Sequence, residues 1–262
     1  MKKKNKLERV IENAGWVFKN FKKITPSSVL VDQPTYSSDG LTIQNNSDCL
    51  TEPKFAKAYN LSLTVNDWRA ELNMDMRWRF FIVCYFANKV KNLEGDFVEC
   101  GVYKGGYSLA IADYINFGSI NKQFWLLDTF NGLVKKYITA EEEKAGLFEF
   151  YKDRYEDCYD AVKRTFEPYK NYQIIKGAVP ETLPMCKAEK IAYLSIDMNC
   201  VEPEIEAANY FWDKLVSGAV MILDDYGFST HIQQKKAFDK FAEEKNVQIL
   251  SLPTGQAIIF KP

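Results

Sequence analysis

Acidic residues stand at the ends of two apolar runs that we expect to form strands. "KIAYLSIDM" closes on Asp197, and "AVMILDDYG" closes on Asp224 and Asp225. The carboxyl ends of parallel strands meet at one edge of a sheet, so these three carboxylates should gather there. Because like charges repel, gathering them is costly without a cation among them. Three carboxylates form a hard oxygen site suited to Mg²⁺, whereas the alternative is that each acid caps the helix after its strand.

A second group that could do chemistry surrounds the glycines of "GDFVECGVYKGGYSLAIA". Glu99 stands before Gly101, the turn continues to Gly106, and Asp128 ends the next apolar run, "QFWLLDTF". Glycines let a backbone approach a ligand closely, and an acid about 20 residues further on is placed to bind a ribose. Tyr103 departs from the G-x-G-x-x-G pattern of pyrophosphate sites, which favours S-adenosylmethionine, a cofactor with adenosine and no phosphates. The alternative is a glycine turn that only reverses the chain.

His231 is the only histidine of the chain and follows Asp225 by six residues, at the start of a predicted helix. It could act as a general base beside the metal acids. A lone histidine at a helix start is more often a surface or capping neighbour. Both interpretations stay open at this point.

The composition excludes several classes of protein. The 262 residues are 47% hydrophobic and 26% charged, as in ordinary globular proteins, and a net charge of −1 gives no basic field for nucleic acid. The six cysteines form no C-x-x-C pair and, with one histidine, do not fit the ligand spacing of a zinc site. Reduced, buried cysteines predict a cytoplasmic protein. We expect no membrane span and no signal peptide, because no apolar run approaches about 18 residues.

From residue 95 onward, strand and helix patterns alternate. The expected strands are "GDFVECGV", "QFWLLDTF", "YQIIKGAV", "KIAYLSIDM", "AVMILDDYG", "VQILSLP" and "QAIIFKP". The expected helices are "GGYSLAIADYINFG", residues 140–167, "EPEIEAANYFWDKLVSG" and "HIQQKKAFDKFAEEK", with a short turn near 180–187. The alternation predicts an α/β, Rossmann-like fold with a mostly parallel seven-stranded sheet. Only "PTG" separates the last two strands, which should form an antiparallel hairpin.

The N-terminal part follows different patterns. Residues 1–23 carry eight lysines and arginines against two glutamates, with apolar residues at helical spacing. This basic helix could rest on an anionic membrane surface, on its own domain or on a neighbouring subunit. Residues 24–66 are rich in Pro, Ser, Thr, Asn and Asp, which predicts an extended covering segment without a core of its own. We therefore divide the chain into residues 1–66 and a domain at 67–262.

Two further segments of that domain have an expected structure. Residues 67–93 fit a long, mostly buried helix. The segment 133–167 is longer than a simple crossover requires and mixes Tyr and Phe with many charges. It could be a mobile lid over a site or an ordinary pair of surface helices.

Taken together, the motifs resemble the macrocin O-methyltransferase family, class I S-adenosylmethionine-dependent enzymes that methylate sugar hydroxyls. The resemblance rests on "RWRFFIVCYFANKV", "LEGDFVECGVYKGG", "LLDTFNGL", "KGAVPETLP", "LSIDMN", "LDDYG" and "LPTGQAIIFK". These stretches occur in order over residues 50–262, which is far more specific than a glycine loop alone. The resemblance implies a class I methyltransferase fold, S-adenosylmethionine and Mg²⁺ as cofactors, and an acceptor with free hydroxyls on a sugar, glycan or natural-product precursor.

The resemblance also implies roles for individual residues. In such enzymes the loop acid and glycines hold the cofactor, the acid of "LLDTF" holds its ribose, and the acid after "LSI" holds Mg²⁺ together with the "DD" pair. With neighbouring motif positions, the predicted cofactor-binding residues are Glu99, Cys100, Gly101, Tyr103, Gly105, Ser108, Asp128, Thr129, Phe130 and Gly177. The predicted metal ligands are Asp197, Asp224 and Asp225. Relatives are oligomeric, which predicts a homodimer or larger assembly.

The proton acceptor is less firmly indicated. The predicted catalytic residues are Asp197, as first choice, and His231. Some relatives have a histidine in the segment that corresponds to 133–167, which this chain lacks. Cys200 stands where the more distant catechol-type magnesium methyltransferases have a lysine. The general base therefore stays open.

Two other classes of protein fit part of the pattern. A metal-dependent hydrolase would use the acid cluster and leave Glu99 and the glycine turn without a role. A binding protein could keep the fold without turnover, although an idle metal site would leave unpaired buried charge. Binding of S-adenosylhomocysteine separates these classes from a methyltransferase.

Overall fold

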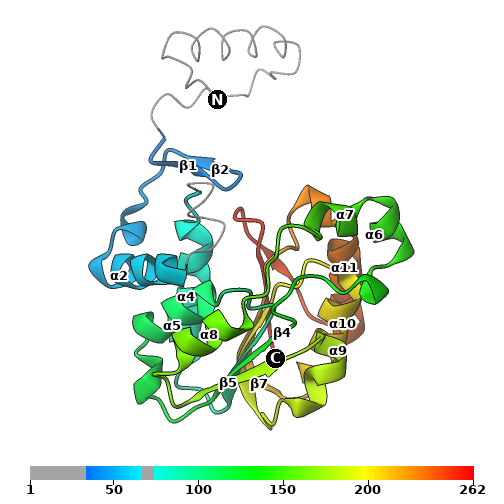
Figure 1. The fold of residues 1–262 in the computed structure, drawn as a ribbon. Coiled ribbons are helices and arrows are strands. Elements are labelled where there is room, and N and C mark those ends of the chain that lie inside the picture. The colour runs from blue at the N-terminus through cyan, green and yellow to red at the C-terminus, as the bar shows by residue number, and fades with distance from the viewer. Residues whose placement is uncertain (1–33, 66–73) are drawn as a thin grey trace, which may run out of the picture.

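A seven-stranded sheet with helices on both faces forms the centre of the molecule in the computed structural model, which describes residues 34–65 and 74–262 (Figure 1). Its strands are β3 Asp96–Cys100, β4 Phe124–Asp128, β5 Tyr172–Lys176, β6 Ile191–Ile196, β7 Leu215–Leu223, β8 Leu250–Ser251 and β9 Ala257–Phe260. Their order across the sheet is β5-β4-β3-β6-β7-β9-β8. β9 runs antiparallel to both of its neighbours, and the other pairs are parallel. The predicted parallel sheet with a terminal hairpin is confirmed.

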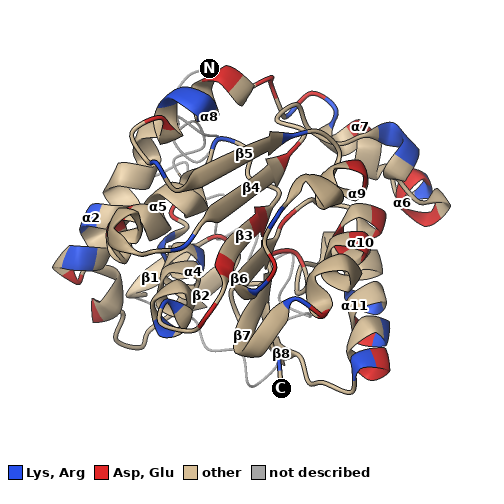
Figure 2. Ribbon diagram, turned by 90° about the horizontal axis from the view of Figure 1, so that it is seen from below, with Lys and Arg blue, Asp and Glu red and all other residues tan. Residues whose placement is uncertain are grey.

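Helices cover the sheet in two layers. One face carries α2 Pro53–Ser62, α4 Arg77–Val90, α5 Gly106–Tyr114 and α8 Tyr159–Phe166. The other face carries α9 Val179–Thr182, α10 Val201–Trp212 and α11 Ile232–Lys245. Between β4 and β5 lie the short helices α6 Ala140–Lys144 and α7 Leu147–Tyr151. Figure 2 shows the charged residues gathered on outer helices such as α6, α10 and α11, while the central strands are mostly uncharged.

The alternation of side chains along each strand builds two buried apolar layers. On β3, Phe97 packs into the core beneath α4 and α5, whereas Val98 packs into the core beneath α10. On β7, Ile222 and Met221 divide between the same two layers. A strand with both faces covered must be apolar throughout, which is why these strands are nearly continuous hydrophobic runs. The sheet is therefore a rigid support for the residues at its edge.

The register of the strands brings the candidate residues to one level. The amide of Asp197 donates to the carbonyl oxygen of Cys100 (2.8 Å), and the amide of Asp224 donates to that of Ile196 (3.0 Å). Gly101, which follows β3, lies beside Asp197 for the same reason. The chain proceeds from β3 towards β5 on one side and from β6 towards β7 on the other. A crevice forms where the strand order reverses in this way, and ligands of open α/β sheets bind there.

The prediction of an extended segment up to residue 66 is wrong for α2. This helix packs beside α5, with Phe55 fully buried. The carboxylate of Glu52 accepts the backbone amide of Lys54 (3.2 Å) and that of Phe55 (2.9 Å), and Pro53 occupies the first helical position. An acidic cap followed by proline is a strong helix start, and this local signal outweighs the polar composition around it.

Before α2, the described chain forms a small hairpin of β1 Tyr36–Ser38 and β2 Leu41–Ile43. The hydroxyl of Tyr36 donates to the carbonyl oxygen of Asp75 (2.6 Å), which fixes the hairpin to the start of α4. The predicted basic helix at residues 1–23 lies outside the described residues.

Three other elements differ from the prediction in their boundaries. Residues 67–73 of the helix expected at 67–93 lie outside the described residues, and in the described part α4 begins at Arg77, whose amide donates to the side chain of Asp75 (3.0 Å). The helix expected to continue through "DKLVSG" ends at Trp212, and β7 begins at Leu215. A register shift in the pairing of β6 with β7 interrupts the apolar alternation there, which hides the strand in the sequence. The strand expected in "VQILSLP" is confined to the two residues of β8.

The six cysteines are all free thiols, and five of them are buried. Within residues 34–65 and 74–262, none of the helices combines the length and the hydropathy that a membrane crossing requires.

Candidate active site

The loop after β3 is packed so closely that it needs glycine. Gly101 has a φ of +89°, and a Cβ added to it would lie 1.7 Å from the carbonyl oxygen of Asp197. Gly105 has a φ of +84°, and a Cβ there would lie 2.6 Å from the ring of Phe166 in α8. Only glycine combines this backbone conformation with such close approach. The loop is thereby wedged between β6 and α8, and its backbone forms one wall of a pocket.

Asp128, at the end of β4, ties this loop to the sheet. Its Oδ2 accepts the amides of Val102 (2.6 Å) and Tyr103 (2.7 Å). Its Oδ1 accepts the amide of Phe130 (2.6 Å) and the hydroxyl of Thr129 (3.2 Å). A carboxylate has about four acceptor positions, so donors of the protein itself occupy them. Asp128 therefore holds the loop in shape, including Tyr103 at a φ of +48°, in addition to the ribose role predicted for it.

Glu99 is buried at the end of β3, with one oxygen accepting the hydroxyl of Ser108 in α5. Burial raises the pKa of Glu99 to about 8, against the opposing effect of the Ser108 hydrogen bond. The carboxyl is therefore mostly protonated at neutral pH. A cation placed beside it would favour the ionised form.

A pocket of about 720 Å³ runs along the carboxyl ends of the strands. Half of the predicted cofactor-binding residues line it: Glu99, Gly101, Tyr103, Asp128 and Thr129. The other half do not line it: Cys100, Gly105, Ser108, Phe130 and Gly177. This second set supports the first through packing and hydrogen bonds, as when the amide of Gly177 donates to the carbonyl oxygen of Asp128 (2.8 Å).

Asp197, Asp224 and Asp225 converge further along the same pocket. One oxygen from each carboxylate lies within 4.8 Å of the others. Asp224 and Asp225 are buried, and Asp197 is partly exposed. The Oδ2 atom of Asp225 is buried and has no hydrogen-bond partner among the described residues. The prediction that these three acids gather at one edge of the sheet is confirmed.

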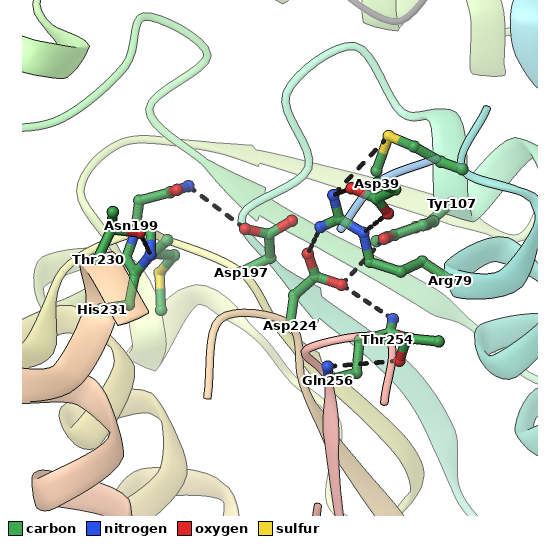
Figure 3. A network of polar contacts seen from close by, with 12 residues as sticks. Asp39, Arg79, Tyr107, Asp197, Asn199, Asp224, Thr230, His231, Thr254 and Gln256 are labelled. Carbon is green, nitrogen blue, oxygen red and sulfur yellow. Dashed lines mark hydrogen bonds and ion pairs between the residues drawn. The ribbon is translucent and has the colours of Figure 1, made fainter. Parts of the chain in front are cut away.

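Asp224 is held by three donors from separate elements (Figure 3). Its Oδ1 accepts the hydroxyl of Tyr107 (2.9 Å) and the amide of the Gln256 side chain (2.9 Å). Its Oδ2 accepts Nη1 of Arg79 (2.7 Å). The carboxylate is therefore fixed in orientation, and Arg79 is the one donor that the described residues place on Oδ2.

Arg79 is a site residue that the sequence prediction missed. It is 8% exposed, and its Nε and Nη2 donate to the two carboxylate oxygens of Asp39 (2.7 and 2.9 Å) in the turn of the β1–β2 hairpin. Burial opposes the charge of Arg79, but Asp224 and Tyr107 hold its pKa well above the ordinary value. The sequence did contain a signal for Arg79, which lies on the apolar face of a predicted helix between Met76 and Val83. A buried arginine needs an acidic partner. The identity of that partner lay beyond the sequence.

The electrostatics of the three acids fit a divalent cation. Burial first, and then repulsion by Asp224 and Asp225, raises the pKa of Asp197 well above its ordinary value. Burial and Asp224 raise the pKa of Asp225 to about 7. A divalent cation would remove this repulsion, and the unpaired Oδ2 of Asp225 offers it an unused ligand atom. An all-carboxylate oxygen set is the kind that Mg²⁺ and similar hard cations prefer.

His231 is buried in the wall of the pocket next to the acid cluster and immediately precedes α11. Its Nε2 lies 3.0 Å from the hydroxyl oxygen of Tyr151, and its Nδ1 lies 2.9 Å from that of Thr230. Burial lowers the pKa of His231 below its ordinary value, so the ring is neutral at pH 7. The alternative of a surface neighbour is wrong, because His231 is buried, whereas His231 does occupy the N-cap position of α11, without a capping hydrogen bond from its side chain.

The segment 133–167 both packs on the domain and lines the pocket. The buried Glu142 in α6 accepts the amide of Val201 (2.8 Å) and so caps α10. Tyr151 and Tyr155 line the pocket, as does Phe150, which is 52% exposed. The segment consists of short helices attached to the domain that also wall one side of the site.

Comparison with known proteins places the chain among enzyme families. The family model described as macrocin-O-methyltransferase (TylF) matches residues 66–251, most of the chain. The chain belongs to this family. Within it, the acid cluster, the β3 loop and Asp128 all fall inside the matched range.

Individual relatives are distant. The demethyldecarbamoylnovobiocin O-methyltransferase of Streptomyces niveus is 24% identical over 52% of this chain and 54% of that protein. The 8-demethyl-8-(2,3-dimethoxy-α-L-rhamnosyl)-tetracenomycin-C 4'-O-methyltransferase of Streptomyces olivaceus is 26% identical over 50% and 53%. The chain thus spans about half the length of the curated relatives it matches. The solved structure of the O-methyltransferase NovP has a TM-score of 0.62 at 21% identity, covering 70% of this chain and 79% of that one, and confirms the class I methyltransferase fold.

Proposed function

We propose that this member of the macrocin-O-methyltransferase family is a Mg²⁺-dependent S-adenosylmethionine O-methyltransferase that acts on a hydroxyl of a sugar, glycan or natural-product precursor. The observation that carries the proposal is that one pocket is lined both by the β3 loop with Glu99 and Asp128 and by the three converging acids. A methyl donor and a hydroxyl acceptor need neighbouring binding sites in one cavity, and this pocket offers two chemically different halves.

The half beside β3 and β4 suits S-adenosylmethionine. The buried Glu99 is placed to bind the ammonium of its methionine end, which would return the carboxyl to its ionised form. The backbone of Gly101 and Tyr103 walls the pocket next to it. At Asp128, the Thr129 hydroxyl is the longest of the four bonds, so it is the donor that a ribose hydroxyl would replace.

The half beside β6 and β7 suits Mg²⁺ and the acceptor. Asp197, Oδ2 of Asp224 and Oδ2 of Asp225 would hold the ion. Mg²⁺ supplies Lewis-acid polarisation of an acceptor hydroxyl, which lowers the pKa of that hydroxyl. Arg79 holds Asp224 in the orientation that this requires, and the acid and aromatic walls restrict the acceptor to a few orientations. Asp197 and His231 are the candidate proton acceptors from the chain's own residues.

The names of two relatives support a glycoside or natural-product acceptor, since one of them includes a rhamnosyl group and both are O-methyltransferases. We further propose that residues 133–167 act as a lid on the acceptor half, that the chain forms a homodimer or larger assembly, and that it works in the cytoplasm. Peripheral membrane contact through residues 1–23 stays a prediction from the sequence.

The test is calorimetric titration with S-adenosylhomocysteine, with and without Mg²⁺, on the wild type and on Glu99→Gln and Asp225→Asn. We expect wild-type binding, weaker cofactor binding in Glu99→Gln, and loss of Mg²⁺ binding alone in Asp225→Asn. Transfer of a tritiated methyl group to TDP-L-rhamnose and to methyl α-L-rhamnoside then compares a nucleotide-linked acceptor with a neutral one. Mg²⁺ binding without S-adenosylhomocysteine binding would overturn the proposal in favour of a metal-dependent hydrolase, and cofactor binding without transfer to any hydroxyl acceptor would favour a non-catalytic protein.

A further inference from the structure

Tyr151 and His231 form a buried polar pair in the wall of the pocket. The Tyr151 hydroxyl lies 3.0 Å from Nε2 of His231, although the two residues stand 80 positions apart in the sequence. They are 8% and 6% exposed, and both line the pocket together with Asp197 and Asp225. On the far side of the imidazole, Oγ1 of Thr230 lies 2.9 Å from Nδ1. A tyrosine, a histidine and a threonine thus form a continuous chain that starts at the pocket.

The direction of these hydrogen bonds depends on which ring nitrogen of His231 carries the proton. Burial, together with the charges of Asp225 and Asp197, raises the pKa of Tyr151, so its hydroxyl keeps its proton at neutral pH. Burial keeps His231 neutral, with one N–H and one lone pair on its ring. In the Nδ1–H tautomer, the Tyr151 hydroxyl donates to Nε2 and Nδ1–H donates to Thr230, and proton transfer from the pocket to His231 requires this tautomer. This arrangement leaves the lone pairs of the Tyr151 oxygen free to accept a proton from a ligand.

We propose that Tyr151 is the catalytic residue that takes the proton of the acceptor hydroxyl and that His231 is its final acceptor. The inference rests on the proposed methyltransferase function and deepens it. As the acceptor oxygen bonds to the methyl carbon, the carbon–sulfur bond breaks and its electron pair goes to sulfur. The hydroxyl proton moves to the Tyr151 oxygen while the Tyr151 proton moves to Nε2 of His231. The positive charge of the sulfonium therefore ends on the imidazolium, which later releases its proton to solvent.

Asp197 competes for this role. Its carboxylate belongs to the cluster that fits a divalent cation, and a carboxylate beside a cation is a weak base. A neutral imidazole has its pKa much closer to the working pH, which is the condition for efficient proton transfer. His231 has both ring nitrogens engaged, so it can reach the acceptor only through Tyr151.

The Tyr151 ring is held in position by its neighbours. Phe150 meets it edge to face at 4.9 Å between centroids, and Tyr155 stacks on it at 5.9 Å with an interplanar angle of 20°. Tyr155 in turn accepts the side-chain amide of Asn199 (3.3 Å), which also donates to Asp197. The hydroxyl of Tyr151 is thereby fixed relative to the acids, as a proton relay requires.

The first test uses the fact that the chain has a single histidine. Nuclear magnetic resonance of the protein labelled with ¹⁵N-histidine reports which ring nitrogen carries the proton, with S-adenosylhomocysteine and Mg²⁺ present or absent. We expect the Nδ1–H tautomer in the wild type, and a raised His231 pKa in Tyr151→Phe because the neutral ring loses a hydrogen bond. Tyr172→Phe is the matched control, since Tyr172 is also 8% exposed and its hydroxyl donates to the carbonyl oxygen of Ser108 (3.4 Å) outside the pocket. An Nε2–H tautomer in the wild type would overturn the relay.

The second test measures kcat against pH with TDP-L-rhamnose and methyl α-L-rhamnoside as acceptors. Tyr151→Phe should lower kcat about 100-fold with little change in KM or in S-adenosylhomocysteine binding. In the wild type, kcat should fall as pH drops through the His231 pKa, and His231→Gln should lose this acid limb. The charges of Asp224, Glu142 and Arg79 also act on the pKa of His231. The contribution of His231 to the acid limb is therefore taken from the difference between the pH profiles of the wild type and His231→Gln.

The outcomes separate the two hypotheses. A Tyr151→Phe enzyme with wild-type kcat and pH profile would overturn the relay and leave the methyltransferase proposal intact. If the wild type binds no S-adenosylhomocysteine, the proposed function fails irrespective of the histidine tautomer. If it binds the cofactor but methylates neither probe, the rhamnosyl acceptor is wrong, and the tautomer of His231 decides the relay.

Discussion

Asp128 and Asp225 are both acids at the ends of strands and line the same pocket, yet the hydrogen bonding of their carboxylates differs. Asp128 accepts three backbone amides and one hydroxyl, so the protein fully satisfies it. Asp225 has a buried oxygen without a hydrogen-bond partner among the described residues and lies against two further acids. The first arrangement stabilises the fold without a ligand, and the second costs free energy until a cation arrives.

The difference extends to the two halves of the pocket. In the half beside β3, close backbone packing shapes the wall, as at Gly101. In the half beside β7, side chains from distant segments shape the wall. They are Arg79 from α4, Gln256 from the position before β9 and Asp39 from the N-terminal hairpin. We infer that the first half is preorganised by the backbone and the second is completed by charge. Five substitutions test this contrast.

Gly101→Ala should have the largest effect, because it pushes the two halves apart. The new Cβ would meet the backbone of Asp197, which cannot move without displacing β6. We expect a loss of about 5 kcal/mol in the free energy of unfolding, or failure to fold. Gly146→Ala is the matched control: Gly146 has a similar φ of +78° but nothing within 4 Å of a Cβ, so it should cost only about 1 kcal/mol. Equal losses in urea denaturation would show that backbone strain rather than packing explains Gly101.

Arg79→Met should come next, because it leaves Asp39 and Asp224 buried without their cationic partner. We expect a loss of about 3 kcal/mol in the free energy of unfolding at pH 7. Saturating Mg²⁺ should restore part of it, since a divalent cation supplies the missing positive charge next to Asp224. Adding Asp39→Asn to Arg79→Met should also restore part of the lost free energy of unfolding. If neither addition changes the denaturation midpoint, Arg79 stabilises the fold through packing alone.

Asp128→Asn and Asp225→Asn should change stability in opposite directions. The first loses an acceptor for the amides of Val102 and Tyr103 and should destabilise by about 2 kcal/mol. The second removes a charge whose pKa is raised to about 7 and should stabilise the metal-free protein by about 2 kcal/mol, roughly half of what the whole shift represents.

The effect of Asp225→Asn also has a defined pH dependence. A raised pKa means that the wild-type charge costs stability fully above about pH 7, and that this cost disappears as pH falls towards about 4. The advantage of the variant should shrink over the same range. Thermal unfolding measured across it, without Mg²⁺, checks the sign, and a destabilised Asp225→Asn at pH 7 would contradict the contrast.

The parts of the site that follow strand order were predictable from the sequence, and the parts that depend on tertiary contacts were not. Acids directly after buried strands had to meet at one edge of the sheet, and Asp197, Asp224 and Asp225 do. The partner of Arg79 could not be derived, because no periodicity links a helix to a hairpin turn 40 residues earlier. Likewise, Tyr151 was only one aromatic residue among several in a segment without a clear pattern. The error at α2 was of another kind, since its cap was present at Glu52 and Pro53 and was outweighed by composition.

The smallest predicted effect concerns Glu99, the one acid of the first half that is not satisfied in its charged form. With its pKa raised to about 8, Glu99 must lose a proton before it can pair with the ammonium of S-adenosylhomocysteine. Binding should therefore weaken about tenfold for each pH unit below 8, and should release close to one proton at pH 7. Calorimetry in buffers of different ionisation enthalpy measures both quantities. Glu99→Gln should bind more weakly, without this proton release and without the pH dependence. A wild-type affinity that is flat between pH 6 and pH 8 would mean that Glu99 serves only to hold Ser108, and the first half would then be neutral throughout.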